Sequence, residues 1–267
     1  DRKALQAGTS HFLGQNFAKA SEIIFQSRDG ERVHAWTTSW GVSTRLIGGM
    51  IMTHADDDGM RMPPRLAPSH VVVIPIFRND EERDDVLPYC TRLAELLRGQ
   101  IYDGAPVRVE LDVRDIGAGE KGWQWVKRGI PVRVEVGPRD LKSGSVFVGR
   151  RDKGPREKVS APRDSFVAEI ASILEDIQNT MFNAARAHMI ANTVQIDDWE
   201  AFKKFFTPAD ANKPEIHGGF VESGWCGSND CEDQANRDLS VSIRCIPTEA
   251  RSHVENCVLC GQKALHQ

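Results

Sequence analysis

A chain of 267 residues is long enough for two or three domains with sizeable cores. Its 40% hydrophobic and 27% charged residues are ordinary for a soluble protein, and no run of about 18 apolar residues or apolar signal-peptide core is present, so we expect a cytoplasmic protein with no membrane partner. The net charge of −4 does not indicate nucleic-acid binding, although a basic face can lie on an acidic protein.

The N-terminal part begins with a predicted hairpin. The stretch SEIIFQSRDGERVHAWTTSW (21–40) has an apolar strand, a turn at Asp29-Gly30 and an alternating strand. The following STRLIGGMIMTH (43–54) has apolar residues at helical spacing, although its two adjacent glycines weaken that prediction. Arg45 carries a permanent charge at the start of this helix, where the helix dipole makes a cation unfavourable. The stretch PPRLAP (63–68) is expected to be a stiff linker.

Strands and helices alternate in the middle of the chain, which predicts an α/β domain with a mixed or parallel sheet. A continuous apolar run, HVVVIPIF, indicates a strand that is covered on both faces. We expect Asp164 or Ser165 to cap the long helix, and a further helix in DDWEAFKKFF. The predicted strands are 70–77, 107–113, 130–137 and 144–151, and the predicted helices are 79–100, 120–129, 164–192 and 197–206.

Five of the six cysteines lie in the last 42 residues. Four of them form two close pairs, a pattern that four tetrahedral thiolate ligands of a structural zinc ion require. Such a closed shell leaves no position for a substrate, and the alternative is a set of free or partly oxidised cysteines. Cys245 lies in a strand-like stretch between the pairs and is expected to be a core residue rather than a ligand. The predicted ligands are Cys226, Cys231, Cys257 and Cys260.

Three stretches occur in the order seen in prolyl-tRNA synthetases, and the chain resembles that family over essentially its whole length. They are QAGTSHFLGQNFAK (6–19), SWGVSTRLIGGMIMTHADDDGMRMPPRLAP (39–68) and KRGIPVRVEVGPRDL (127–141). The first two resemble the latter half of a class II synthetase catalytic domain, and the third resembles its anticodon-binding domain. The cysteine-bearing module resembles the C-terminal extension of the archaeal/eukaryotic-type prolyl enzymes, which also occurs in some bacteria.

The resemblance implies a multidomain fold that combines α/β and α+β parts. Residues 1–66 would be the C-terminal part of the antiparallel-sheet catalytic domain, with class II motif 3. Residues 67–190 would be the α/β anticodon-binding domain with a long C-terminal helix, and residues 191–267 a small α+β zinc-binding domain.

The same resemblance implies a role for Arg45 as the motif 3 arginine that contacts ATP and serves catalysis. A guanidinium suits this role because it stays charged and offers a planar fork of donors. Gln6 and Thr9 match residues that contact the adenosine part of ATP, and Ser43 matches a hydroxyl residue beside ATP. The alternative for Arg45 is a charge that reaches solvent from the helix start.

For proline, the resemblance implies a pocket lined by His11, Ser39, Trp40 and Gly41. Trp40 can form an aromatic wall without offering a polar group to a competing substrate. His11 is not expected to be a general base, because the substrate carboxylate is already ionised and needs positioning and charge stabilisation instead. The alternatives are a hydrogen-bonded core histidine and simple core packing of the tryptophan.

In the middle domain, Arg133 and Glu135 are two residues apart on one strand and therefore share a face. Such side chains read the edges of single-stranded anticodon bases, and a carboxylate can accept from the amino group of guanine. The alternative is a solvated strand face with a cross-pair. Trp123 and Trp125 could stack on bases or pack between helix and sheet. The predicted anticodon residues are Arg133, Glu135, Arg139 and Asp140.

Class II motifs 1 and 2 are not recognisable, and the chain ends in ALHQ rather than in the tyrosine usual for this extension. We therefore expect the sequence to be part of a larger enzyme. The resemblance implies activation of L-proline with ATP and Mg²⁺, transfer to tRNA(Pro), a structural Zn²⁺ and a homodimer. Two alternatives are a non-catalytic tRNA-binding relative and a class II synthetase for threonine or glycine.

Overall fold

The computed structural model describes residues 2–154, 157–210, 218–248 and 255–266. Its backbone forms two compact units, one made of residues 1–49 with 189–267 and the other of residues 50–188. No helix within the described residues is long and apolar enough to cross a membrane.

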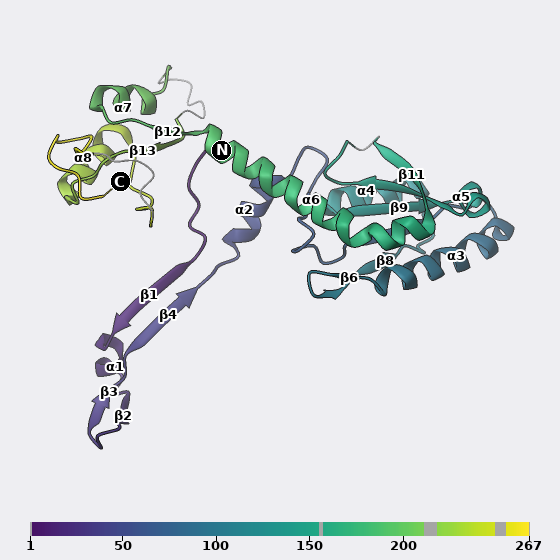
Figure 1. The fold of residues 1–267 in the computed structure, drawn as a ribbon, viewed down its shortest axis with the longest axis horizontal. Coiled ribbons are helices and arrows are strands. Elements are labelled where there is room, and N and C mark those ends of the chain that lie inside the picture. Colours follow the sequence, from purple (N-terminus) through teal and green to yellow (C-terminus); the bar gives the residue numbers. More distant parts are fainter. Residues whose placement is uncertain (1, 155–156, 211–217, 249–254, 267) are drawn as a thin grey trace. The chain divides into compact units, whose positions relative to one another are not determined.

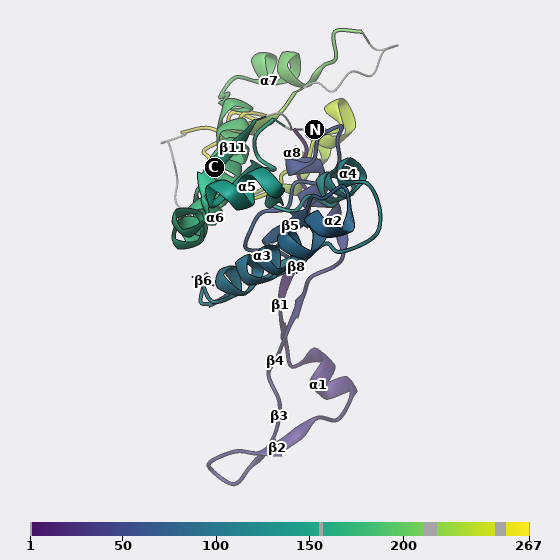
Figure 2. The same ribbon diagram turned by 90° about the vertical axis from the view of Figure 1, so that its right-hand side faces the viewer.

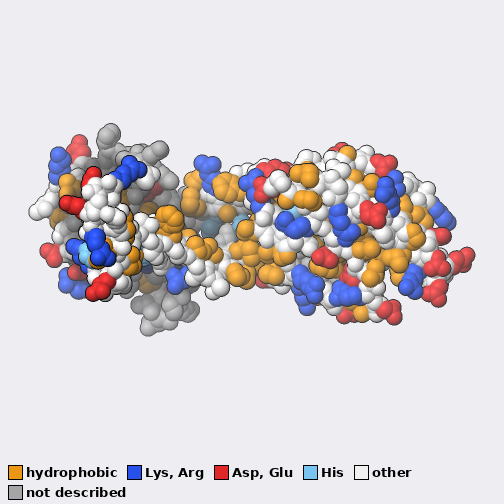
Figure 3. All heavy atoms as spheres, turned by 90° about the horizontal axis from the view of Figure 1, so that it is seen from below, with side chains coloured by type: hydrophobic (Ala, Val, Ile, Leu, Met, Phe, Trp, Pro, Cys, Tyr) orange, Lys and Arg blue, Asp and Glu red, His pale blue; other side chains and the backbone are white. Residues whose placement is uncertain are grey.

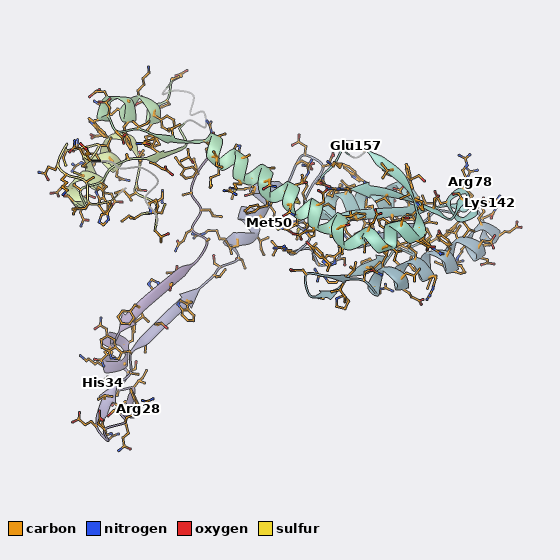
Figure 4. All side chains as sticks on the ribbon, in the orientation of Figure 1. Arg28, His34, Met50, Arg78, Lys142 and Glu157 are labelled. Carbon is orange, nitrogen blue, oxygen red and sulfur yellow. The ribbon has the colours of Figure 1, made fainter. Side chains whose placement is uncertain are left out.

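The N-terminal segment is a two-stranded antiparallel ribbon that carries a small hairpin at its end (Figure 1, Figure 2). Strand β1 (Thr9–Gly14) pairs with β4 (Thr37–Gly41). Between them lie helix α1 (Asn16–Ala20) and the antiparallel hairpin of β2 (Ile24–Gln26) and β3 (Arg32–His34). The predicted hairpin is confirmed, and Gly30 in its turn has a φ of 82°. Figure 4 labels Arg28 in this turn and His34 on β3.

Helix α2 (Arg45–His54) follows the ribbon, as the helical spacing predicted. Its glycine pair coincides with a close approach of the N-terminal segment, because a Cβ on Gly49 would lie 2.6 Å from Cδ2 of Leu5. Met50 marks the middle of this helix in Figure 4.

The unit of residues 50–188 contains a five-stranded mixed sheet, which confirms the predicted α/β arrangement. Its strand order is β11-β10-β9-β5-β8, with β8, β5 and β9 parallel and β10 and β11 antiparallel to their neighbours. The strands are β5 (Val71–Pro75), β8 (Val109–Leu111), β9 (Val132–Val136), β10 (Ser145–Arg150) and β11 (Lys158–Pro162). A short hairpin joins β6 (Ile101–Tyr102) and β7 (Ala105–Pro106).

Helices cover both faces of this sheet, which explains why β5 is a continuous apolar run. Val71 and Val73 pack in the larger core with residues of α3 and α6, whereas Val72 and Ile74 pack on the opposite face beside Trp125 of α4. The helices are α3 (Asp80–Arg98), α4 (Ala118–Arg128), α5 (Pro138–Ser143) and α6 (Arg163–Ala191).

The helix starts follow local hydrogen bonding. Oδ1 of Asn79 accepts from the backbone N–H of Glu82 at 2.8 Å and caps α3. The expected cap of α6 is wrong, because the helix already begins at Arg163 and Asp164 lies in its first turn. There the carboxylate of Asp164 is paired with the Arg163 guanidinium rather than with a backbone N–H group.

The C-terminal module is built from short elements. Strand β12 (Thr193–Gln195) pairs in parallel with β13 (Phe220–Glu222), and the predicted helix is present as α7 (Trp199–Phe206), capped by Asp198. Helix α8 (Asn229–Leu239), which we did not predict, carries Cys231.

The strand expected around Cys245 is absent. Residues 241–247 have no regular secondary structure, and Cys245 is exposed, so its prediction as a core residue is wrong. Its apolar neighbours in the sequence suggested a buried strand, but Ile243 and Ile246 are also exposed.

A buried carboxylate organises the end of β8. Asp112 is 4% exposed and accepts hydrogen bonds from Nε of Arg114 at 2.8 Å and from the indole N–H of Trp125 at 2.8 Å. The bonds from Arg114 lower the pKa of Asp112 to about 2, against burial, which would raise it. The bond also holds Trp125 between helix and sheet, so Trp125 has the packing role rather than the stacking role.

Replacing Asp112 with Asn should reduce the free energy of unfolding at pH 7 by about 2 kcal/mol. The folded-state pKa is depressed, so this contribution is present above the unfolded pKa of about 4 and is lost as the pH falls toward 2. Urea unfolding at pH 7 and pH 3 should therefore show a smaller difference between wild type and variant at pH 3. Asp85→Asn, on an exposed position of α3, is the control. An equal difference at both pH values would contradict the assignment.

Candidate functional site

The four residues predicted to contact ATP form one hydrogen-bonded cluster. Nη1 of Arg45 donates to Oε1 of Gln6 at 3.3 Å, although the two residues are 39 positions apart in the sequence. Nε2 of Gln6 in turn donates to Oγ1 of Thr9 at 3.0 Å, and the backbone N–H of Arg45 donates to Oγ of Ser43 at 3.3 Å. All four are at least partly exposed, so the cluster is open to a ligand.

The pairing of β1 with β4 creates this cluster. Thr9 lies opposite Gly41, and a Cβ on Gly8 would lie 3.2 Å from the carbonyl oxygen of Gly41. The segments around Gly8 and Gly41 therefore run in close contact just before α2 begins at Arg45. The partly negative amide oxygen of Gln6 offsets the unfavourable position of the Arg45 cation at a helix N-terminus. A guanidinium has five N–H donors, so one bond to Gln6 leaves capacity for an anionic ligand.

The residues predicted to hold proline fall on two faces of the ribbon. Directly paired residues of antiparallel strands point to the same face, and the faces alternate along each strand. His11 pairs with Ser39, so both lie on the face that also carries Gly41. Trp40 pairs with Ser10 and lies on the other face. The structure thus brings three of the four residues together and does not bring Trp40 to their side.

Neither His11 nor Trp40 is a core residue in this structure. His11 is exposed, and the Trp40 side chain is 78% exposed at the rim of a shallow hollow. The hollow is lined by Gly8, Thr9, Ser10, Trp40, Gly41 and Val42. On the same ribbon, the ring of exposed Phe12 stacks on that of Trp36, with centroids 5.6 Å apart. A concentration of exposed aromatic surface of this kind is typical of a face that binds protein or a ligand.

The predicted anticodon residues do not form one exposed surface. Arg133 is only 4% exposed, and its Nε has no hydrogen-bond partner within the described residues. Burial lowers the pKa of Arg133, and the nearby charge of Arg151 lowers it further. Asp140 accepts from the backbone N–H of Gly137 at 2.9 Å and so has a structural role at the start of α5. Arg139 is exposed.

Glu135 has partners that the sequence did not reveal. Its carboxylate forms an ion pair with Lys158 on β11, and it lies opposite Phe147 on β10. Nζ of Lys158 also lies 5.7 Å from the centroid of the Phe147 ring. Lys158 was not predicted as a site residue, because β11 was not predicted. Its contact with Glu135 depends on strand order rather than on local sequence.

Two tryptophans of α4 have different surroundings. Trp125 is bonded to Asp112, whereas Trp123 is 43% exposed and has Nζ of Lys127 5.4 Å from its ring centroid. On the face that Figure 3 shows, basic and acidic side chains of this unit are interspersed with hydrophobic ones. The accessible candidates for a nucleic-acid surface are therefore Trp123, Glu135, Arg139, Phe147 and Lys158.

The four predicted metal ligands converge. Their Sγ atoms all lie within 4.8 Å of one another, with 3.6 Å between Cys226 and Cys231 and 3.7 Å between Cys226 and Cys260. Zinc–sulfur bonds of about 2.3 Å in a tetrahedron place the sulfurs about 3.8 Å apart. The residues present therefore fit a zinc ion, which would cross-link α8 to the C-terminal turn. Cys245 is not in the group.

The backbone around these thiols also favours the binding of a metal ion. Burial would raise the pKa of Cys257, but backbone N–H groups, including those of Cys260 and Leu259, bring it to about 7. Gly227 and Gly261, next to two of the candidate ligands, have φ values of 83° and 70°, which permit tight turns of the backbone around one ion.

The purified protein should contain about one zinc ion per chain. Cys257→Ser should remove most of this metal and lower the melting temperature of the C-terminal module, because three thiolates hold zinc less tightly than four. Elemental analysis and thermal unfolding measure the two effects. Cys245→Ser is the matched control and should keep the metal. Metal loss in the control that equals the loss in Cys257→Ser would contradict the assigned ligand set.

Comparisons with known proteins agree with this arrangement. A family model described as "Anticodon binding domain" matches residues 70–173, and one described as "Prolyl-tRNA synthetase, C-terminal" matches residues 210–267. Proline--tRNA ligase 2 of Anaeromyxobacter dehalogenans is 53% identical over 266 residues, which are 98% of this chain and 52% of that protein. Proline--tRNA ligase of Bdellovibrio bacteriovorus is 51% identical over 264 residues, which are 99% of this chain and 52% of that protein.

A solved structure shows the same fold. Prolyl-tRNA synthetase from Cryptosporidium parvum, complexed with L-proline and AMP, superimposes with a TM-score of 0.82 at 31% identity, over 99% of this chain and 53% of that one. The chain thus spans about half the length of the relatives it matches. The two family matches and these relatives together show that the chain belongs to the prolyl-tRNA synthetase family.

Proposed function

We propose that the chain is the latter part of a proline--tRNA ligase, which converts L-proline and ATP to prolyl-adenylate and pyrophosphate and transfers the prolyl group to tRNA(Pro). The observation that carries this proposal is the hydrogen-bonded cluster of Gln6, Thr9, Ser43 and Arg45. It joins residues from two distant segments at the start of α2, where a charged group has no role in packing. The identity of relatives named proline--tRNA ligase supports the choice of substrate.

In the proposed reaction, a carboxylate oxygen of proline attacks the α-phosphorus of ATP and pyrophosphate leaves. Negative charge on the transferring group has to be offset, and the Arg45 guanidinium can do this with fixed donors. Gln6 and Thr9 would hold the adenosine part, and Gln6 also orients Arg45 through its amide oxygen. Mg²⁺ would be held chiefly by the ATP phosphates.

For the amino acid, we place proline on the ribbon face that carries His11, Ser39 and Gly41. These residues would position the substrate and would not take its proton, because the carboxylate is ionised at neutral pH. Trp40 as a wall of the same pocket stays a prediction. Its position beside Ser10 favours a second role, in which the ring packs against further protein that covers the aromatic face.

For tRNA, we propose the sheet face around Glu135 and Lys158 as the anticodon surface. Glu135 can accept from a guanine amino group, while Lys158 and Arg139 can contact base edges or phosphate. Exposed Trp123 and Phe147 offer rings for base stacking. Arg133, which is buried, would act mainly by stabilising the negative charge of Glu135 through its own positive charge.

The remaining expectations complete the proposal. The three regions 1–66, 67–190 and 191–267 would be the end of a class II catalytic domain, an anticodon-binding domain and a zinc-stabilised α+β module. The enzyme would be a cytoplasmic homodimer. The exposed aromatic face of the ribbon supports a larger catalytic domain, since such a surface is unfavourable in water.

Proline-dependent exchange between ATP and pyrophosphate in the complete protein tests this proposal. Proline should support exchange, whereas threonine and glycine should not. Arg45→Ala should reduce the rate about 100-fold or more, because a preorganised charge at the phosphate is lost. Arg28→Ala, in the exposed turn of the hairpin between β2 and β3, should leave the rate unchanged (Figure 4).

Each contrary result has a distinct meaning. Exchange that depends on threonine or glycine would identify a different class II synthetase. No exchange with any amino acid would favour a non-catalytic tRNA-binding relative. Full activity of Arg45→Ala would show that the site lies elsewhere.

A further inference from the structure

Two of the four clustered thiols can be reached from solvent, and two cannot. Cys260 is exposed and Cys226 is half-buried, whereas Cys231 and Cys257 are only 7% and 2% exposed. Cys260 lies in a turn in which the backbone N–H of Gly261 donates to the carbonyl oxygen of Cys257 at 2.9 Å. A Cβ on Gly261 would meet no described atom within 4 Å, so the outer side of this turn is open. A small reagent can therefore approach the sulfur of Cys260 more easily than the other three.

The two reachable thiols are also neighbours in space. Sγ of Cys260 lies 3.7 Å from Sγ of Cys226, although the residues are 34 positions apart in the sequence. In a disulfide bond the sulfurs lie about 2 Å apart, and side-chain rotation can close a gap of this size. Sγ of Cys231 is equally near to Cys226, at 3.6 Å, but it is buried on α8. An oxidised Cys260 thus has a partly exposed thiol within reach.

Main-chain hydrogen bonds hold this pair of cysteines together. The N–H of Trp225 donates to the carbonyl oxygen of His266 at 2.8 Å, and the N–H of His266 donates to that of Trp225 at 3.0 Å. This bridge attaches the chain immediately before Cys226 to the segment 257–266, which carries Cys260. The proximity of the two thiols therefore has a backbone cause of its own, which does not depend on a bound ion.

We propose that Cys260 is a site of reversible oxidation by hydrogen peroxide and that Cys226 is its resolving thiol. The Cys260 thiolate attacks one peroxide oxygen, the O–O bond breaks, a sulfenic acid forms at Sγ, and hydroxide leaves. The Cys226 thiolate then attacks this sulfur, the S–O bond breaks, the disulfide forms, and a second hydroxide leaves. Solvent protonates both hydroxides to water. The two cysteines lose two electrons, which the peroxide gains.

The inference rests on the zinc-stabilised module of the proposed function and goes beyond its catalytic activity. After oxidation, only the buried thiolates of Cys231 and Cys257 remain as ligands, and two ligands do not complete a tetrahedral shell. The zinc ion would therefore be released, and α8 would lose its metal cross-link to the C-terminal turn. A thiol reductant restores the four thiolates by exchange with the disulfide, so the change is reversible.

The test treats the complete, zinc-loaded protein with a small molar excess of hydrogen peroxide and follows zinc release with a chromogenic chelator. Release should be about tenfold or more faster than without peroxide. Peptide mass mapping without reduction should find a disulfide between Cys226 and Cys260. A dithiol with added zinc should then restore the free thiols and the bound metal. Cys245→Ser, which removes an exposed cysteine outside the group, is the control and should respond as the wild type does.

A second variant keeps the metal but removes the oxidation target. Cys260→His leaves three cysteines and one histidine, a ligand set that zinc accepts, and the exposed position has room for an imidazole. This variant should bind zinc before treatment, which shows that the module is folded. Its zinc release in peroxide should fall close to the rate of the untreated protein.

Three results would overturn the inference. They are zinc release from Cys260→His as fast as from the wild type, a mapped disulfide that joins Cys226 to Cys231 instead, and a sulfinic acid at Cys260 without any disulfide. Absence of zinc from the untreated protein would refute the metal site and the inference with it. Absence of proline-dependent exchange before treatment would refute the proposed catalytic function alone, because the disulfide is mapped independently of activity.

Discussion

The pairing of β1 with β4 is the constraint on which the candidate site depends. It brings residues that precede a long excursion of the chain beside residues that follow it, and it ends where α2 begins. Without this ladder, Gln6 and Arg45 would have no reason to meet. The pairing also explains why a cation lies at a positive helix end, since Arg45 is held there by Gln6 and lies exposed rather than in a core.

In the α/β domain, helices cover both faces of the sheet, and this burial determines where charged side chains can lie. Apolar residues of β5 contribute to both cores and those of β9 to the larger one, so the polar residues of β9 face the side of the smaller core. Arg133 and Glu135 are accommodated by neighbours on other strands, chiefly Gly149, which leaves room for a guanidinium, and Lys158. The same arrangement that satisfies these charges leaves Glu135 and Lys158 accessible from one side, which is the property that a nucleic-acid surface needs.

Much of this could be predicted from local sequence. The strand at HVVVIPIF, the helices around Leu46 and Phe166 and the convergence of four cysteines follow from the apolar run, the helical periodicity and the cysteine spacing. The features that were missed depend on contacts between distant residues. The partner of Glu135, the face occupied by Trp40 and the burial of Arg133 are set by strand order and register, which no local pattern reveals. The exposure of Cys245 was not predicted, because its apolar neighbours in the sequence are typical of a buried strand.

A crystal structure of the complete protein with proline and a non-hydrolysable ATP analogue tests the proposed site most directly. We expect the Arg45 guanidinium to contact the phosphates, Gln6 and Thr9 to contact the adenosine, and proline to lie on the face of His11 and Ser39. A nucleotide bound away from the start of α2, with Arg45 turned toward solvent, would contradict it.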